Sequence, residues 1–163
     1  MNALLFTLFA FLGMEVIAWV THKYLMHGPM WNWHESHHQP RKGVFEKNDL
    51  FGLVFSTVAI ILIGCGLSVW PPALWLGLGM TLYGGAYLFL HDMLAHKRFG
   101  VHLHPRSGYL RQVLRSHRVH HAHHQKIGCV SFGFLIPKPG LNRAIAKNKT
   151  LIKNRAQGLA NQK

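Results

Sequence analysis

Histidine is the residue type whose number and spacing in this chain most clearly indicate chemistry. The sequence of 163 residues contains 14 histidines, and histidine is the side chain most often used to bind metals in proteins. Ten of them form two copies of one pattern, in which an HxxxxH pair is followed by an HxxHH group. These ten are His22, His27, His34, His37, His38, His91, His96, His117, His120 and His121. The repeated pattern predicts a metal centre rather than isolated interfacial histidines.

The HxxHH groups have the spacing of one α-helical face. A residue three positions further on lies about 60° to one side of the first, and a residue four positions on lies about 40° to the other side. The three imidazoles of each group therefore fall within an arc of about 100°, and we expect their nitrogens to converge on one point. Because ten ligands exceed what one ion can use, the pattern predicts two ions with about five nitrogens each.

The HxxxxH pairs do not have this helical spacing. Residues five apart on a regular α-helix are separated by about 140°, so one face cannot present both rings to one ion. Either the second histidine lies beyond the helix end or at a π-bulge, or the two histidines serve different ions. His22 and His91 each follow closely on an apolar run, which favours the first explanation.

Three apolar runs must position these histidines, and they cover residues 4–20, 50–69 and 73–90, with Glu15 as the only charged residue inside them. An 18-residue helix is about 27 Å long, close to the hydrocarbon thickness of about 30 Å. Pro71 and Pro72 predict a tight turn between two antiparallel spans. The expected fold class is all-α, an integral membrane helical bundle of about three transmembrane helices plus cytoplasmic helices that carry the histidine cluster.

The charge of the chain is strongly asymmetric, with 18 Lys and Arg against 5 Asp and Glu and a net charge of +13. All basic residues follow residue 20 and fall in 23–47 or from 97 onward. The positive-inside rule therefore places 21–49 and the region after 91 on the cytoplasmic side. No nucleic-acid recognition motif accompanies the charge, so nucleic acid is not expected as a partner.

We divide the chain into a membrane domain, 1–137, and a basic cytoplasmic tail, 138–163. The tail has seven basic residues and no acidic ones. It is either solvated or attracted to anionic lipid headgroups, which is worth about 1 kcal/mol per basic side chain near the surface. The first apolar run lacks the basic flank and cleavage site of a signal peptide, so we expect the mature protein to keep it.

The histidines alone leave the metal open, because imidazole binds zinc, copper, nickel and iron. Their position at the mouths of apolar spans suits a lipid-soluble substrate, and attack on an unactivated C–H bond requires a redox metal with dioxygen, which zinc cannot provide. A His-rich membrane metal-binding or transport protein is the alternative. Such a protein would need ligands at the membrane midplane, whereas all 14 histidines lie outside the three runs.

The order HxxxxH, HxxHH, HxxxxH, HxxHH resembles that of the membrane fatty acid hydroxylase superfamily of non-haem di-iron enzymes. From about residue 13 to 137, the chain is similar to the bacterial β-carotene hydroxylase family in the stretches EVIAWVTHKYLMHG, WHESHHQPRKGVFEKNDL, HDMLAHKRFG, PRSGYLRQVLRSHRVHHA and GCVSFGFL. The resemblance implies an enzyme of the bacterial inner membrane. It also implies that the ten histidines named above ligate two iron ions.

The resemblance further implies oxygen-dependent hydroxylation of carotenoid β-ionone rings at C3, from β-carotene through β-cryptoxanthin to zeaxanthin. Dioxygen is then the co-substrate, and an electron-donor protein of ferredoxin type or an NADPH-linked donor is the external reductant. The alternative within the superfamily is a hydroxylase or desaturase of another membrane lipid.

Four further residues have less certain roles. Asp92 lies four residues before His96 and is predicted either to accept an imidazole N–H and orient that ligand, or to be a solvated carboxylate. Glu15 lies about two helical turns from His22, and it either meets a histidine or polar group of a neighbouring helix or is a protonated or paired structural carboxylate. His123 and His124 are candidate spare ligands, although His123 is expected to point away from His121.

Overall fold

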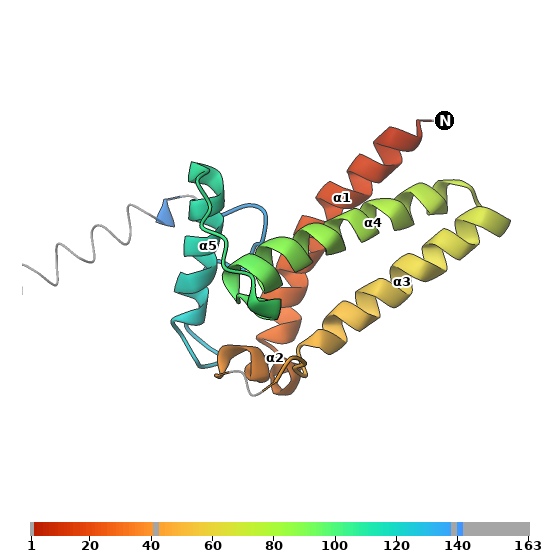
Figure 1. The fold of residues 1–163 in the computed structure, drawn as a ribbon. Helices are drawn as coiled ribbons and strands as arrows, with labels where there is room; N and C mark the ends of the chain where they lie inside the picture. Colours follow the sequence, from red (N-terminus) through yellow and green to blue (C-terminus); the bar gives the residue numbers. More distant parts are fainter. Residues whose placement is uncertain (1, 41–42, 138–139, 142–163) are drawn as a thin grey trace, which may run out of the picture.

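The structure of this chain is a computed structural model that describes residues 2–40, 43–137 and 140–141, and these residues contain helices but no strand. The three longest helices, α1 (Ala3–Val20), α3 (Asp49–Ser68) and α4 (Pro72–Tyr87), run along one another (Figure 1). The predicted all-α bundle and the helical hairpin around the two prolines are therefore confirmed.

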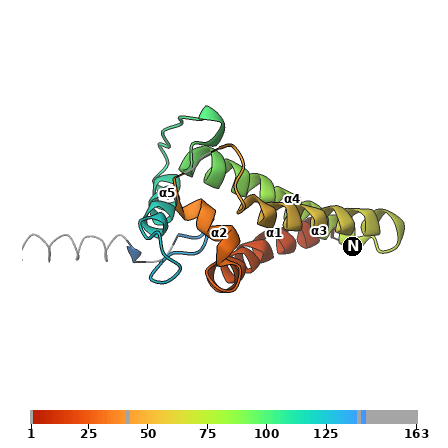
Figure 2. The same cartoon turned by 90° about the horizontal axis from the view of Figure 1, so that it is seen from below.

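The shorter helices α2 (Trp31–His38) and α5 (Gly108–His121) lie together at one end of the bundle, and the long helices extend away from them in both views (Figure 1, Figure 2). The N-terminus and the turn between α3 and α4 lie at the opposite end (Figure 1). The two polar regions that carry the histidine motifs thus meet on the same side of the bundle, as the charge pattern predicts. Most of the proposed basic tail lies outside the described residues.

Two of the long helices continue beyond their apolar runs as π-helices. Helix α1 passes into η1 (Thr21–Met26), and α4 passes into η2 (Leu88–Ala95). A short 3-10 turn, η3 (Arg98–Gly100), follows the second of these. With the π-helices included, Ala3–Met26, Asp49–Ser68 and Pro72–Ala95 are long and apolar enough to cross a membrane. Three spans are therefore present, as predicted.

The outer surfaces of the spans are apolar. Phe9 on α1 is 74% exposed, and Ile60 and Leu67 on α3 are 69% and 74% exposed. Side chains of this kind rarely form large exposed patches on a soluble monomer, whereas in a bilayer they contact lipid. Membrane insertion therefore accounts for the surface as well as for the helix lengths.

Helix α4 packs against both α1 and α3, and glycines allow the close approach. A Cβ added at Gly79 would lie 2.3 Å from the carbonyl oxygen of Thr7 on α1, and one added at Gly77 would lie 2.7 Å from Cγ1 of Ile63 on α3. Small residues commonly allow such contacts between membrane helices, where van der Waals packing drives association.

Replacing Gly79 by alanine is therefore expected to push α4 away from α1 and to lower the free energy of unfolding by about 1–3 kcal/mol. Gly84→Ala is the matched control, because a Cβ at this position of the same helix meets nothing within 4 Å. Unfolding of the two variants in detergent is the measurement. Equal stability of the two variants would contradict this account of the packing.

Candidate metal centre

The ten histidines of the repeated pattern come together as two groups of five, and the ligand atoms within each group lie within 4.8 Å of one another. The first cluster consists of His22, His27, His34, His38 and His120. The second cluster consists of His37, His91, His96, His117 and His121. The structure thus contains two groups of imidazoles, each of a size suited to one ion.

The HxxxxH pairs join one cluster because the backbone is π-helical where they occur. The N–H of His27 donates to the carbonyl of His22 over 3.1 Å, and the N–H of His96 donates to the carbonyl of His91 over 2.9 Å. These i to i+5 hydrogen bonds bring residues five apart to the same side of the helix end. The π-bulge explanation is confirmed, and both histidines of each pair lie in the same cluster.

The prediction that the three nitrogens of each HxxHH group converge on one point is wrong. His34 and His38 join the first cluster, whereas His37 joins the second. The physical reason is the arc of about 100° between positions three and four residues on, which is wide enough to separate two neighbouring sites.

The second HxxHH group is divided in the opposite sense. His117 and His121 belong to the second cluster, and His120 belongs to the first. Each cluster therefore contains one HxxxxH pair, the i and i+4 histidines of one group, and the i+3 histidine of the other. Each copy of the sequence repeat therefore contributes one histidine to the cluster formed mainly by the other copy. His37 and His120 are these two residues, and they connect the two halves of the chain.

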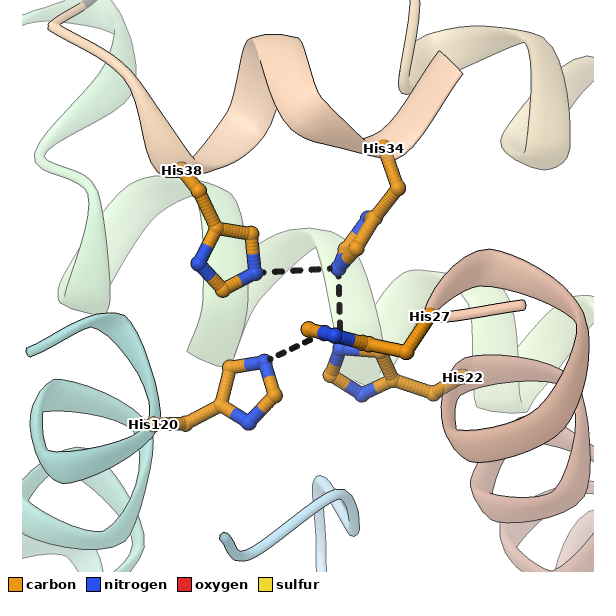
Figure 3. A group of neighbouring side chains, drawn as sticks. All are labelled: His22, His27, His34, His38 and His120. Atoms are coloured by element: carbon orange, nitrogen blue, oxygen red, sulfur yellow. Dashed lines mark hydrogen bonds between the residues drawn. The ribbon is translucent and has the colours of Figure 1, made fainter. Parts of the chain in front are cut away.

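The rings of the first cluster point toward a common centre (Figure 3). Figure 3 shows His34 and His38 on one short helix, His120 on the facing helix, and His22 and His27 on a third segment. The Nε2 of His34 lies 3.1 Å from that of His22 and 3.2 Å from that of His38, and the Nε2 atoms of His27 and His120 are 3.2 Å apart. In the second cluster the corresponding contacts are 2.8 Å for His37 with His91 and 2.7 Å for His96 with His117.

The opposite nitrogen of each ring in the first cluster donates to a neutral acceptor. Nδ1 of His34 donates to Oδ1 of Asn48 over 2.7 Å. The Nδ1 atoms of the other four donate to backbone carbonyls over 2.8 to 3.1 Å, with His22 bonded to Phe132, His27 to Lys126, His38 to His123 and His120 to Val130. Because a carbonyl oxygen can only accept, these bonds place the proton on Nδ1 and leave the Nε2 lone pair facing the centre.

In the second cluster two imidazoles donate to carboxylates instead. Nδ1 of His37 donates to Oε2 of Glu46 over 3.0 Å, and Nδ1 of His91 donates to Oδ1 of Asp92 over 2.7 Å. Asp92 also receives a hydrogen bond of 3.3 Å from Arg98. Asp92 therefore orients a histidine, as predicted, but the hydrogen bond places it on His91, its sequence neighbour, rather than on the expected His96.

Burial keeps these rings neutral. Burial, together with the neighbouring imidazoles, lowers the pKa of His34 to about 3 and that of His38 to about 4. Burial also lowers the pKa of His120 to about 3 and lowers the pKa values of His37, His117 and His121 below the usual range. At neutral pH the nitrogens therefore carry lone pairs that can bind a metal.

The donor set fits metal ions. Two lone pairs about 3 Å apart repel one another unless a cation lies between them, and burial opposes a second proton on either ring. Nε2 of His121 is also buried without a hydrogen-bond partner in the described part of the chain, whereas buried polar atoms are nearly always paired. A metal ion at each cluster would satisfy these nitrogens.

Glu15 on α1 binds the chain segment that follows two of the backbone acceptors of the first cluster, Val130 and Phe132. This carboxylate is 6% exposed and accepts a hydrogen bond of 2.8 Å from the Tyr83 hydroxyl. It also accepts backbone N–H bonds of 2.9 to 3.0 Å from Phe134, Leu135 and Ile136. Glu15 therefore meets a polar group of a neighbouring helix, the Tyr83 hydroxyl on α4, which confirms one of the two alternatives predicted for it. It also binds the backbone close to Phe132.

His123 and His124 lie at the edge of the centre and are members of neither cluster. The carbonyl of His123 accepts from His38, and Nδ1 of His124 lies 2.5 Å from the carbonyl of His38. Next to them a cavity of about 310 Å³ opens beside His96, His117 and His121 of the second cluster. The second cluster is thus the more accessible of the two.

Sequence reasoning missed Glu46 and Asn48, which orient one histidine in each cluster. The available signal was the scarcity of acidic residues. The chain has only 5 Asp and Glu, and two of them, Glu46 and Asp49, lie three positions apart just before the second apolar run. The backbone acceptors at 123, 126, 130 and 132 carry no signal in residue type.

Comparison with known proteins gives consistent results. Residues 7–138 match the model of the fatty acid hydroxylase family. The chain is 51% identical over 147 residues to a beta-carotene hydroxylase of Pseudescherichia vulneris, covering 89% of this chain and 83% of the relative. It is 52% identical over 128 residues to a beta-carotene hydroxylase of Pantoea ananas, covering 78% of this chain and 73% of the relative.

A plant protein is also similar. The beta-carotene 3-hydroxylase 1, chloroplastic, of Arabidopsis thaliana is 45% identical over 134 residues, which are 79% of this chain and 43% of the plant protein. No solved structure matches the chain.

Proposed function

Because the chain belongs to the fatty acid hydroxylase family, we propose that it hydroxylates carotenoid β-ionone rings at C3, converting β-carotene through β-cryptoxanthin into zeaxanthin. The observation that carries this proposal is the pair of five-imidazole clusters at one end of three apolar spans. Imidazole clusters suit oxidative metal chemistry, and their place beside the spans suits a substrate dissolved in the bilayer. The names of the relatives supply the substrate class and, for the plant protein, the ring position.

The ten clustered histidines would hold two iron ions, one in each cluster. Bound iron supplies the activation of dioxygen, and the overall reaction converts a C–H bond to C–OH with one oxygen atom, while two electrons and two protons reduce the other to water. The electrons come from an external donor of ferredoxin type or an NADPH-linked donor. The positive-inside rule supports a centre on the cytoplasmic side of the membrane, and the similarity to bacterial relatives supports the bacterial inner membrane.

The protein contributes orientation and a dry surrounding for this reaction. Hydrogen bonds at Nδ1 orient all five rings of the first cluster and His37 and His91 of the second. Eight of the ten histidines are at most 9% exposed. Leu90, Val113, Leu114 and Phe134 border His91 and His117 of the second cluster. The side chains at this border are apolar, which supports a substrate that is itself apolar.

Expression in bacteria that accumulate β-carotene tests the proposal. Growth in air should yield zeaxanthin, with β-cryptoxanthin as the intermediate pigment, whereas a His34→Ala control should leave β-carotene unchanged. Unchanged β-carotene in cells that contain inserted, iron-loaded wild-type protein would contradict the carotenoid substrate. Metal uptake into vesicles without any oxygen-dependent product would instead favour the transport alternative.

A further inference from the structure

The two clusters differ in the charge of the groups behind their imidazoles. In the first cluster all five Nδ1 atoms donate to neutral oxygens, namely four backbone carbonyls and the Asn48 amide. In the second cluster His37 donates to Glu46 and His91 donates to Asp92. The two clusters therefore contain the same number of histidines but differ in the charge of the groups that accept hydrogen bonds from them.

Both carboxylates of the second cluster are largely buried. The side chains of Glu46 and Asp92 are each 12% exposed, so water and salt screen their charges weakly. Arg98 donates to Asp92 and also to Asp49. Asp92, Asp49 and Arg98 together carry two negative charges and one positive charge. Their net charge is −1, so Arg98 does not cancel the negative charge near His91.

A carboxylate that accepts the Nδ1 proton makes an imidazole a stronger electron donor through Nε2. Stronger donation stabilises a ferric ion more than a ferrous ion, because the ferric ion has the higher charge. Backbone carbonyls and an amide do this less, since they carry no net charge. The shell around the second cluster should therefore favour the higher oxidation state there.

We infer that the two metal sites are electronically inequivalent and that the second cluster holds the more readily oxidised iron. The inference rests on the iron centre of the proposed function and assigns Glu46 and Asp92 as positioning residues that set this difference. With iron bound, Glu46 and Asp92 would give the second cluster the lower reduction potential, so an added one-electron oxidant would oxidise the ferrous ion there first.

One short segment offers a matched pair of substitutions. Glu46 acts on His37 in the second cluster, and Asn48, two residues further on, acts on His34 in the first. Glu46→Gln removes a charge behind the second cluster while leaving an oxygen that can accept from Nδ1. Asn48→Asp adds a charge behind the first cluster and likewise keeps an acceptor.

The test is a redox titration of detergent-purified protein loaded with ⁵⁷Fe, with ferrous and ferric ions counted by Mössbauer spectroscopy. Glu46→Gln should raise the lower of the two one-electron potentials, and Asn48→Asp should lower the higher one. Each change should reduce the equilibrium constant for forming the mixed-valence state by about 10-fold, the smaller effect typical of groups that support metal ligands.

The inference is overturned if Glu46→Gln leaves the lower potential in place, or if Asn48→Asp moves the lower potential rather than the higher one. If Glu46→Gln does not fold, the result for Asn48→Asp decides alone. Pigment analysis with the same variants separates this outcome from the proposed function. Zeaxanthin formation with unmoved potentials refutes only the inequivalence, whereas shifted potentials without zeaxanthin refute only the substrate.

Discussion

His37→Ala and His120→Ala are each expected to lower carotenoid hydroxylation by at least about 100-fold, while the chain still inserts into the membrane. Loss of a group that merely supports a ligand costs about 10- to 100-fold in metal affinity or activity, and these two substitutions would remove the ligands themselves. Both rings lie outside the apolar packing of α1, α3 and α4, so insertion should persist. Pigment analysis and membrane fractionation are the measurements.

Iron content of double variants tests the crossed arrangement of the HxxHH groups. His34 and His120 are distant in sequence but share the first cluster, whereas His117 and His120 are close in sequence but belong to different clusters. The variant His34→Ala/His120→Ala should therefore keep about one iron, and His117→Ala/His120→Ala should keep almost none. The reverse result would mean that each HxxHH group serves a single ion.

Glu15→Ala is expected to lower the free energy of unfolding by at least about 3 kcal/mol and to reduce iron in the first cluster. The substitution leaves three backbone N–H groups and the Tyr83 hydroxyl without their acceptor, and each buried unpaired group costs about 1–3 kcal/mol. Release of this segment also frees the Phe132 carbonyl, which orients His22. Thermal unfolding in detergent and iron content are the measurements.

Two milder variants serve as controls for Glu15. Glu15→Gln keeps one accepting oxygen for the backbone, and its amide can donate to the Tyr83 hydroxyl, so its loss should be smaller. Tyr83→Phe removes one donor and leaves the backbone bonds intact, so its loss should be the smallest of the three. Wild-type stability and iron content in Glu15→Ala would show that this carboxylate does not hold the segment in place.

The membrane helices could be predicted from the sequence because long uncharged runs have few other uses. The turn at Pro71 and Pro72 could also be predicted, since proline restricts the backbone locally. The extent of the first and third helices could not be predicted. Apolarity ends near residues 20 and 90, whereas the backbone continues as π-helix through η1 and η2, and only the HxxxxH spacing carries a sign of this.

The distribution of ligands between the two clusters depends on tertiary packing. Helical geometry correctly places the three rings of an HxxHH group within one arc, but it does not reveal that two sites lie close enough to divide that arc. His37 and His38 are neighbours in sequence, yet their nitrogens belong to different clusters because successive positions on α2 lie about 100° apart around the helix. Only the packing of α2 against the helix ends and α5 determines this division.

The groups that orient the histidines were the least predictable part. Five acceptors are supplied by Asn48 and by backbone carbonyls, and any residue type provides a carbonyl. Asp92 was recognisable as a carboxylate near a ligand, but its side chain accepts from His91, the adjacent residue on η2, a contact that helical spacing does not predict. Glu15 acts on a segment about 120 residues away, and no local pattern predicts such a contact.

Anomalous diffraction from crystals of the iron-loaded protein, recorded above and below the iron absorption edge, tests the central claim most directly. We expect two iron peaks, one enclosed by the Nε2 atoms of His22, His27, His34, His38 and His120 and the other by the nitrogens of His37, His91, His96, His117 and His121. A single peak, peaks outside these ten rings, or peaks that appear only at the zinc edge would contradict a di-iron centre held by the two clusters.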